Sequence, residues 1–210
     1  NYCINCAAYT AVDRAESDQE QAFSINENSV ALLATICHLH EVTLFHISTD
    51  YVFDGTKPGG YLETDPTGPV NVYGASKLAG ENAALALHDK LIIIRTSWLY
   101  AKEGHNFVNS MIRLMKEKQA INVVNDQIGS PTYANDLAAA IIHIILTNPD
   151  PSPGIYHYSN SGSCSWYEFA AEIKTICRFN TIISPIPASS YPTPARRPAF
   201  SILNTEKIQH

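Results

Sequence analysis

Runs of mostly apolar residues, separated by stretches of helical periodicity, constrain the fold of this chain most strongly. The apolar runs are at residues 2–8, 42–47, 91–94, 121–124 and 155–158. Apolar residues recur at helical spacing within residues 17–40, 72–87, 106–118, 134–146 and 165–177. Strands without polar alternation are buried on both faces, as in a parallel sheet covered by helices on each side. The sequence therefore predicts a doubly wound α/β fold.

Three details of this pattern can be compared with a structure. Ser17, with Glu20 three residues later, predicts the N-cap of the first helix, and Ser165 with Glu168 predicts a capping box. The proline-rich tail at residues 182–198 predicts an irregular, extended lobe.

Composition narrows the function classes. With 45% hydrophobic residues, the 210-residue chain can bury a sizeable core. The net charge of −6 makes it a poor candidate for binding a nucleic-acid backbone. No apolar run is long enough to span a bilayer, and no signal peptide is visible. The five cysteines, including the pair Cys3 and Cys6, are expected to be small buried hydrophobes. We therefore expect a cytoplasmic protein that binds neither nucleic acid nor membrane.

Polar clusters follow the first three apolar runs. They are AAYT at residues 7–10, STDY at residues 48–51 and RTSW at residues 95–98. In a parallel α/β sheet, ligands bind beyond the carboxyl ends of the strands. A solvated loop would have a similar composition, so the clusters indicate a binding edge without proving one.

Tyr73 and Lys77 lie four residues apart, which places them on one face of a helix. A lysine ammonium close to a tyrosine favours the phenolate, so the pair can act as a general acid for a carbonyl that is being reduced. A hydroxyl from Thr49 or Ser48 could hold the same carbonyl oxygen. By itself the Tyr-x-x-x-Lys spacing is weak, because it arises by chance in many proteins.

Longer motifs add specificity. They are YGASK at residues 73–77, STDYVFDG at 48–55, NCAAYTAVD at 5–13, RTSWLY at 95–100, NDQIGSPT at 125–132 and YPTPARRP at 191–198. Together they resemble the extended short-chain dehydrogenase/reductase superfamily, and within it the dTDP-4-dehydrorhamnose reductases. The segments occur in family order along essentially the whole chain.

The resemblance implies a reductase that transfers a hydride from NADPH or NADH to the C4 keto group of dTDP-4-dehydro-L-rhamnose. The product, dTDP-L-rhamnose, is used in cell-surface polysaccharide biosynthesis. Tyr73 would donate the proton to the keto oxygen, and Lys77 would lower the pKa of Tyr73 and hold the nicotinamide ribose. Thr49 would be the third catalytic residue, hydrogen-bonded to the substrate oxygen. The choice between NADH and NADPH stays open.

The resemblance also assigns binding residues. Ala8, Tyr9, Thr10 and Ile47 would line the cofactor together with Tyr73 and Lys77. Asp50 and Trp98 would contact the sugar nucleotide together with Thr49. Residues 1–125 would form the remainder of the dinucleotide-binding domain. Residues 126–210 would form mainly a small C-terminal substrate-binding lobe, with some segments returning to the main domain.

Arg196 and Arg197 are a further substrate-binding prediction, drawn from their chemistry. Two adjacent guanidinium groups in a loop stiffened by proline suit a pyrophosphate. The alternative that both are solvated surface arginines stays open.

No metal site is predicted from the residues. His38, His40 and His46 are expected to be packed or surface histidines. Some members of the family bind magnesium through acidic residues at a homodimer contact. Asn135 stands here in place of an expected carboxylate, which argues against magnesium.

Two other functions remain open. One is a nucleotide-sugar epimerase or dehydratase of the same superfamily. The other is a non-catalytic regulatory homologue, like the regulatory subunit of methionine adenosyltransferase. The combination of Thr49, Tyr73 and Lys77 favours the reductase.

The Gly-rich turn that binds the pyrophosphate of a dinucleotide is not found among the ten glycines. The fold is thus predicted to be N-terminally incomplete, with roughly two βα units of about 30 residues preceding this chain. The whole protein would have about 270 to 300 residues. We expect the chain alone to bind NAD(P)H poorly or not at all.

Overall fold

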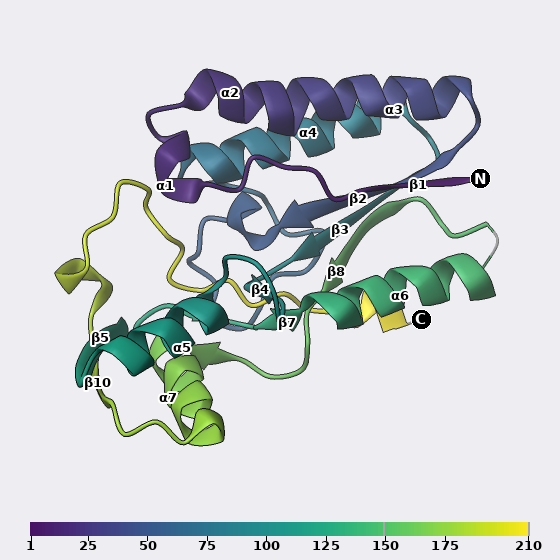
Figure 1. Cartoon of the computed structure of the whole chain (residues 1–210). Helices are drawn as coiled ribbons and strands as arrows, with labels where there is room; N and C mark the ends of the chain where they lie inside the picture. Colours follow the sequence, from purple (N-terminus) through teal and green to yellow (C-terminus); the bar gives the residue numbers. More distant parts are fainter. Residues whose placement is uncertain (149, 210) are drawn as a thin grey trace.

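The computed structural model describes residues 1–148 and 150–209 (Figure 1). Its strands are β1 (Tyr2–Asn5), β2 (Thr43–Thr49), β3 (Leu91–Thr96), β4 (Leu99–Tyr100), β5 (Ala120–Val124), β6 (Ile128–Gly129), β7 (Thr132–Tyr133), β8 (Gly154–Tyr158), β9 (Cys164–Ser165) and β10 (Ile182–Ile186). Its α-helices are α1 (Val12–Ala15), α2 (Gln19–Phe23), α3 (Ser29–Leu39), α4 (Val72–Leu87), α5 (Phe107–Glu117), α6 (Ala134–Thr147) and α7 (Trp166–Cys177).

The main sheet has the order β1-β2-β3-β8, and all of its strand pairs are parallel. In Figure 1, α2, α3 and α4 lie over one face of this sheet, and α6 lies over the other. The predicted doubly wound α/β fold is therefore confirmed.

The central strand β3 explains why its sequence is apolar without alternation. Leu91 and Ile93 pack with Leu44 against α3 and α4 on one face. Ile92 and Ile94 point to the other face, where they pack against α6. Since successive side chains of a strand point to opposite faces, both sets must be apolar when both faces are covered.

A second, smaller layer contains the parallel pair β5 and β10 with α5 and α7 (Figure 1). Ser165 and Glu168 form the predicted capping box at the start of α7. The prediction of an irregular tail is wrong at Ile182–Ile186, which forms β10. Pro185 lies in this strand, and a two-stranded sheet tolerates it because both strands are edges. The domain division at residue 125 stays a prediction.

The first helical region also differs from the prediction. Ser17 is not an N-cap: its hydroxyl donates to the Arg14 carbonyl oxygen at 3.1 Å. Helix begins earlier, at α1, and a π-helical turn at Ser24–Asn28 joins α2 to α3. The reason is Asn26 in that turn, whose buried side chain bonds the segment that follows β1. Such turns are frequent near functional sites.

Two further predictions concern the burial of the cysteines and the membrane-spanning capacity of the helices. Cys6 is exposed rather than buried, because β1 ends one residue before it. Cys177, the last residue of α7, is exposed as well, Cys3 and Cys164 are partly buried, and Cys37 is buried. Across the two described stretches, no helix combines the length and the apolar character that crossing a membrane requires.

Candidate active site

Thr49, Asp50 and Tyr73 meet at the carboxyl edge of the main sheet. Thr49 is the last residue of β2, and Tyr73 lies in the first turn of α4. The Thr49 hydroxyl donates to Asp50 Oδ1 at 3.0 Å, and it lies close enough to the Tyr73 side chain to influence the pKa of that phenol. The structure thus brings the phenol of Tyr73 to the hydroxyl and carboxyl groups of the adjacent residues Thr49 and Asp50, which lie in a distant part of the sequence.

The expected lowering of the Tyr73 pKa is not found. Burial raises the pKa of Tyr73 to about 12; the nearby Thr49 hydroxyl opposes this, and the negative charge of Asp50 adds to it. The Tyr73 hydroxyl is therefore held in its protonated form at neutral pH, ready to donate.

Lys77 lies one turn further along α4 and is buried, with 2% of its surface exposed. Its Nζ donates to the Ile47 carbonyl oxygen at 2.7 Å and lies 3.4 Å from His46 Nε2. Burial lowers the pKa of Lys77 to about 8, although the nearby Glu81 carboxylate opposes this. The ammonium is thus anchored to β2.

His46 supports Lys77 from within β2. Asn5 Nδ2 lies 3.0 Å from His46 Nδ1, so both ring nitrogens of His46 have polar neighbours. Burial and the Lys77 charge lower the pKa of His46 to about 3, which keeps the ring neutral. The expectation that His46 is a packed histidine agrees with this burial.

A buried ion pair fixes the far side of α4. Arg95 of β3 donates to both carboxylate oxygens of Glu81, and its Nη2 lies 2.6 Å from Oε2. The side chains are 3% and 1% exposed. The Arg95 guanidinium also lies over the Phe53 ring, 5.1 Å from its centroid. This pair joins the helix that carries Tyr73 to the sheet that carries Thr49.

Several buried polar atoms at this edge have no hydrogen-bond partner in the described residues. They are Ser48 Oγ, Asp50 Oδ2 and Thr96 Oγ1, at the carboxyl ends of β2 and β3. Burial raises the pKa of Asp50 to about 7, against the effect of its hydrogen bonds. Buried polar atoms without partners are costly, so their clustering indicates a place where a polar ligand is received.

The predicted cofactor residues Ala8, Tyr9 and Thr10 follow β1 at the same edge. Asn26 holds them there: its Oδ1 accepts from Tyr9 N at 2.8 Å, and its Nδ2 donates to Tyr9 O at 3.1 Å and to Ser76 Oγ at 2.9 Å. The Tyr9 hydroxyl donates to Asp18 and so points toward the start of α2.

Trp98 follows β3 in the left-handed region, with a φ of 46°. Its ring stacks on Trp166 of α7, with centroids 3.4 Å apart and an interplanar angle of 6°. A Cβ at Gly129 would lie 2.5 Å from the Trp98 ring, so only glycine fits beside it. Trp98 therefore joins the carboxyl edge of the main sheet to the smaller layer.

Arg196 and Arg197 behave differently from each other. Arg197 makes a two-pronged ion pair with Asp13, at 3.0 and 2.8 Å. The Arg196 side chain is exposed, while its carbonyl oxygen accepts from Asn71 Nδ2 at 2.7 Å. Since Asn71 also caps α4 through Gly74 N, it ties the arginine loop to the helix of Tyr73.

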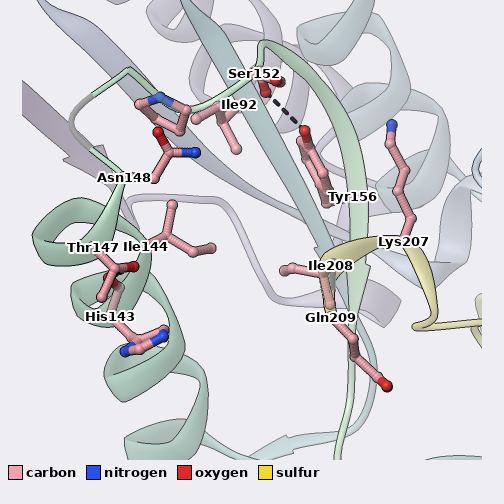
Figure 2. Close-up of a pocket in the computed structure, with 11 residues that line it drawn as sticks. Ile92, His143, Ile144, Thr147, Asn148, Ser152, Tyr156, Lys207, Ile208 and Gln209 are labelled. Atoms are coloured by element: carbon pink, nitrogen blue, oxygen red, sulfur yellow. Dashed lines mark hydrogen bonds between the residues drawn. The ribbon is translucent and has the colours of Figure 1, made fainter.

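A cavity of about 400 Å³ lies at this loop and is lined by residues 191–197 with Gln127 and Ala188. A second cavity, of about 350 Å³, is shown in Figure 2. It lies between the end of α6, the start of β8 and the C-terminal 3-10 turn, with Tyr156 and Lys207 on one side. Because Ile92 lies near the start of β3, this second cavity opens at the edge opposite to Thr49 and Tyr73.

Sequence reasoning missed Asn26, Asn71 and the pair of Glu81 with Arg95. A weak signal existed for Asn71, which directly precedes α4 and has the side chain of an N-cap. The other three act through contacts between distant segments, for which the sequence carries no local pattern.

The parallel sheet, the buried Lys77 and the neighbouring Thr49 and Tyr73 define the Rossmann-like class of the extended short-chain dehydrogenases/reductases. Comparison with known proteins gives the family: residues 1–210 match the model of the RmlD substrate binding domain. The chain belongs to this family.

Two individual relatives and one solved structure support this family. The chain is 44% identical over 218 residues to a dTDP-4-dehydrorhamnose reductase of Aggregatibacter actinomycetemcomitans, covering 100% of this chain and 74% of that protein. It is 46% identical over 215 residues to the enzyme of the same name from Escherichia coli K12, covering 98% and 72%. A crystal structure of dTDP-4-dehydrorhamnose reductase from Bacillus anthracis in complex with NADP matches with a TM-score of 0.94 and 46% identity, covering 98% of this chain and 72% of that one.

Proposed function

We propose that the protein is an NADP-dependent dTDP-4-dehydrorhamnose reductase, which reduces the C4 keto group of dTDP-4-dehydro-L-rhamnose to give dTDP-L-rhamnose. The observation that carries the proposal is the grouping of Thr49 and Tyr73 at the carboxyl edge of the sheet, on the helix that also carries the anchored Lys77, in a chain whose relatives bear this name. The expectation from the motifs agrees with these relatives.

Tyr73 is the proton donor. Like any tyrosine, it carries the proton on Oη at neutral pH, where a substrate oxygen that gains negative charge can take it. Thr49 supplies a second hydroxyl at the same place, and the two hydroxyls together fix the position of the keto oxygen.

Lys77 and the loop after β1 fit a nicotinamide cofactor. An ammonium has three N–H donors. Ile47 O takes one of them and His46 Nε2 lies near, so a donor is left for a ribose hydroxyl. Ala8, Tyr9, Thr10 and Ile47 would line the same ligand. When bound, the reduced cofactor supplies the hydride.

Asp50, Trp98, Arg196 and Arg197 would bind the sugar nucleotide. The Asp50 carboxyl, with one oxygen unpartnered, offers a hydrogen bond to a sugar hydroxyl. The exposed guanidinium of Arg196 is free to approach a pyrophosphate, whereas Arg197 can do so only by sharing its charge with Asp13. The cavity of about 400 Å³ beside both arginines supports this placement.

The experiment is a reaction of the purified full-length protein with dTDP-4-dehydro-L-rhamnose and NADPH. We expect one NADPH to be oxidised for each dTDP-L-rhamnose formed. An epimerase or dehydratase would convert its substrate with no net loss of NADPH. A regulatory homologue would show no turnover and would instead bind a partner protein.

The remaining expectations belong to the same proposal. A reductase of nucleotide sugars is expected in the cytoplasm, where its substrate is made. A homodimer stays a prediction, which light scattering during size-exclusion chromatography would test. Magnesium is not part of the proposal, because Asn135 is exposed and the adjacent Asp136 is hydrogen-bonded to Asn160.

A further inference from the structure

Three potential metal ligands meet at the edge of the sheet opposite to Thr49 and Tyr73. His38 lies in the last turn of α3, His88 follows the last residue of α4, and Asp89 comes next in the chain. Their ligand atoms all lie within 4.8 Å of one another, and the described residues contain no other such group of three. No motif in the sequence connects His38 with His88.

His88 is set up as a ligand. Its side chain is fully buried, and the Nε2 atom lies 2.9 Å from the Val42 carbonyl oxygen. A carbonyl can only accept, so Nε2 carries the proton and Nδ1 keeps its lone pair. Nδ1 is buried and has no hydrogen-bond partner. A ring nitrogen fixed by a backbone carbonyl behind it is the usual arrangement of a metal-binding histidine.

Distances within the group suit a tetrahedral ion. His38 Nδ1 lies 3.3 Å from Asp89 Oδ1, and His88 Nδ1 lies 3.7 Å from the same oxygen. Ligands that are each 2.0 to 2.2 Å from a tetrahedral zinc ion are about 3.4 Å apart. Two imidazoles and one carboxylate form a donor set that suits zinc, and also cobalt or nickel.

We propose that His38, His88 and Asp89 bind one zinc ion, which links the C-terminal ends of α3 and α4. The ion takes Nδ1 of each histidine and Oδ1 of Asp89, and water completes the coordination. The helices α3 and α4 pack on each other, and α4 carries Tyr73 and Lys77. Because the bound ion links their ends, it stabilises this helix pair and so supports the active-site helix.

The alternative is an ion pair without a metal. Asp89 Oδ1 then contacts His38 Nδ1 and His88 Nδ1 with no ion between them. In that case added Zn²⁺ neither binds nor raises the melting temperature of the protein.

The test uses untagged, metal-free full-length protein and titrates it with Zn²⁺, and separately with Co²⁺ for its visible absorption. The variants are His38→Ala and Asp89→Asn, which change exposed side chains and should fold, with His105→Ala as the matched exposed control. His88→Gln is a further variant, to be interpreted only if it folds.

We expect one ion per chain, a higher melting temperature with Zn²⁺, and the d–d absorption of a four-coordinate Co²⁺ complex. His38→Ala and Asp89→Asn should each weaken binding by more than about tenfold, while His105→Ala leaves it unchanged. Failure of the unaltered protein to bind Zn²⁺, or equal affinity in His38→Ala, Asp89→Asn and the control, would overturn the proposal.

Discussion

Lys77 Nζ donates a hydrogen bond to the Ile47 carbonyl oxygen across 2.7 Å, joining the helix that carries Tyr73 to the strand that ends in Thr49. The lysine is therefore fixed by the protein backbone, and its position does not depend on a ligand. This bond and the Thr49–Tyr73 contact fix the position of the helix residues Tyr73 and Lys77 relative to Thr49 at the end of the strand.

Replacement of Lys77 by methionine removes the donor and keeps most of the side-chain volume. We expect kcat/KM to fall by about 10²- to 10⁴-fold and the KM for NADPH to rise, because the proposed ribose contact is lost. Steady-state kinetics measure both. Lys116→Met, at an exposed position of α5, is the control. Normal kinetics in Lys77→Met would show that the buried ammonium has only a structural role.

The buried Glu81–Arg95 pair predicts that single and double substitutions change the free energy of unfolding in a non-additive way. Removal of one partner, as in Glu81→Ala, leaves a buried charge without compensation and should cost about 3 to 5 kcal/mol in the free energy of unfolding. The double variant Glu81→Leu with Arg95→Leu should lose less stability than the sum of the losses in the single variants Glu81→Leu and Arg95→Leu. Urea denaturation measures each value, and strict additivity would contradict the coupling.

The raised pKa of Asp50 predicts that the free energy of unfolding depends on pH. Its pKa is about 7 in the folded protein and near 3.8 in the unfolded chain, so the folded state binds more protons between these values. The contribution to stability is therefore complete below about pH 4 and is lost as the pH rises through 7. The loss is at most about 4 kcal/mol.

Asp50→Asn isolates this contribution. His46 and His157 both have pKa values lowered to about 3, mainly by burial, and so stabilise in the opposite direction across acidic pH. Their effects cancel when the unfolding free energies of the variant and the unaltered protein are subtracted at each pH. We expect the difference to change between pH 4 and 7. A flat difference, like that of the exposed control Glu103→Gln, would refute the raised pKa.

The arginine loop predicts unequal effects of two adjacent residues. Arg196→Ala removes an unshared charge and should raise the KM for the sugar nucleotide by about tenfold or more. Arg197→Ala should raise it as well and should also loosen the loop, because the ion pair with Asp13 is lost. Arg113→Ala on α5 is the control. An unchanged KM in both loop variants would remove the arginines from the substrate site.

The sheet and most helices could be predicted from the sequence because their signals are local. The four successive apolar residues at 91–94 indicate a strand buried on both faces, and the structure has both faces of β3 covered. The capping box of Ser165 with Glu168 is equally local. The strand β10 was not predicted, since the prolines of the tail argued against it, and its pairing with β5 and its packing against α7 join segments that are distant in the sequence.

The site was predictable as a set of residues and not as an arrangement. The motifs indicated Thr49, Tyr73 and Lys77, but the pKa of Tyr73 was expected to fall. Desolvation depends on everything packed around the phenol, and the direction of Lys77 depends on a backbone oxygen of another segment. Neither the desolvation of Tyr73 nor the direction of Lys77 can be inferred from the four-residue spacing of the two residues. The same holds for His38 and His88, which meet through the packing of two helices.

The central claim is that Tyr73 donates the proton in a reductase reaction. The most direct measurement is the rate of NADPH oxidation by Tyr73→Phe in the presence of dTDP-4-dehydro-L-rhamnose, with Tyr167→Phe on α7 as the matched control. The account predicts that Tyr73→Phe loses nearly all turnover, by about 10²-fold or more, while nucleotide binding stays largely intact and Tyr167→Phe is unaffected. Retention of most of the activity in Tyr73→Phe would contradict the account.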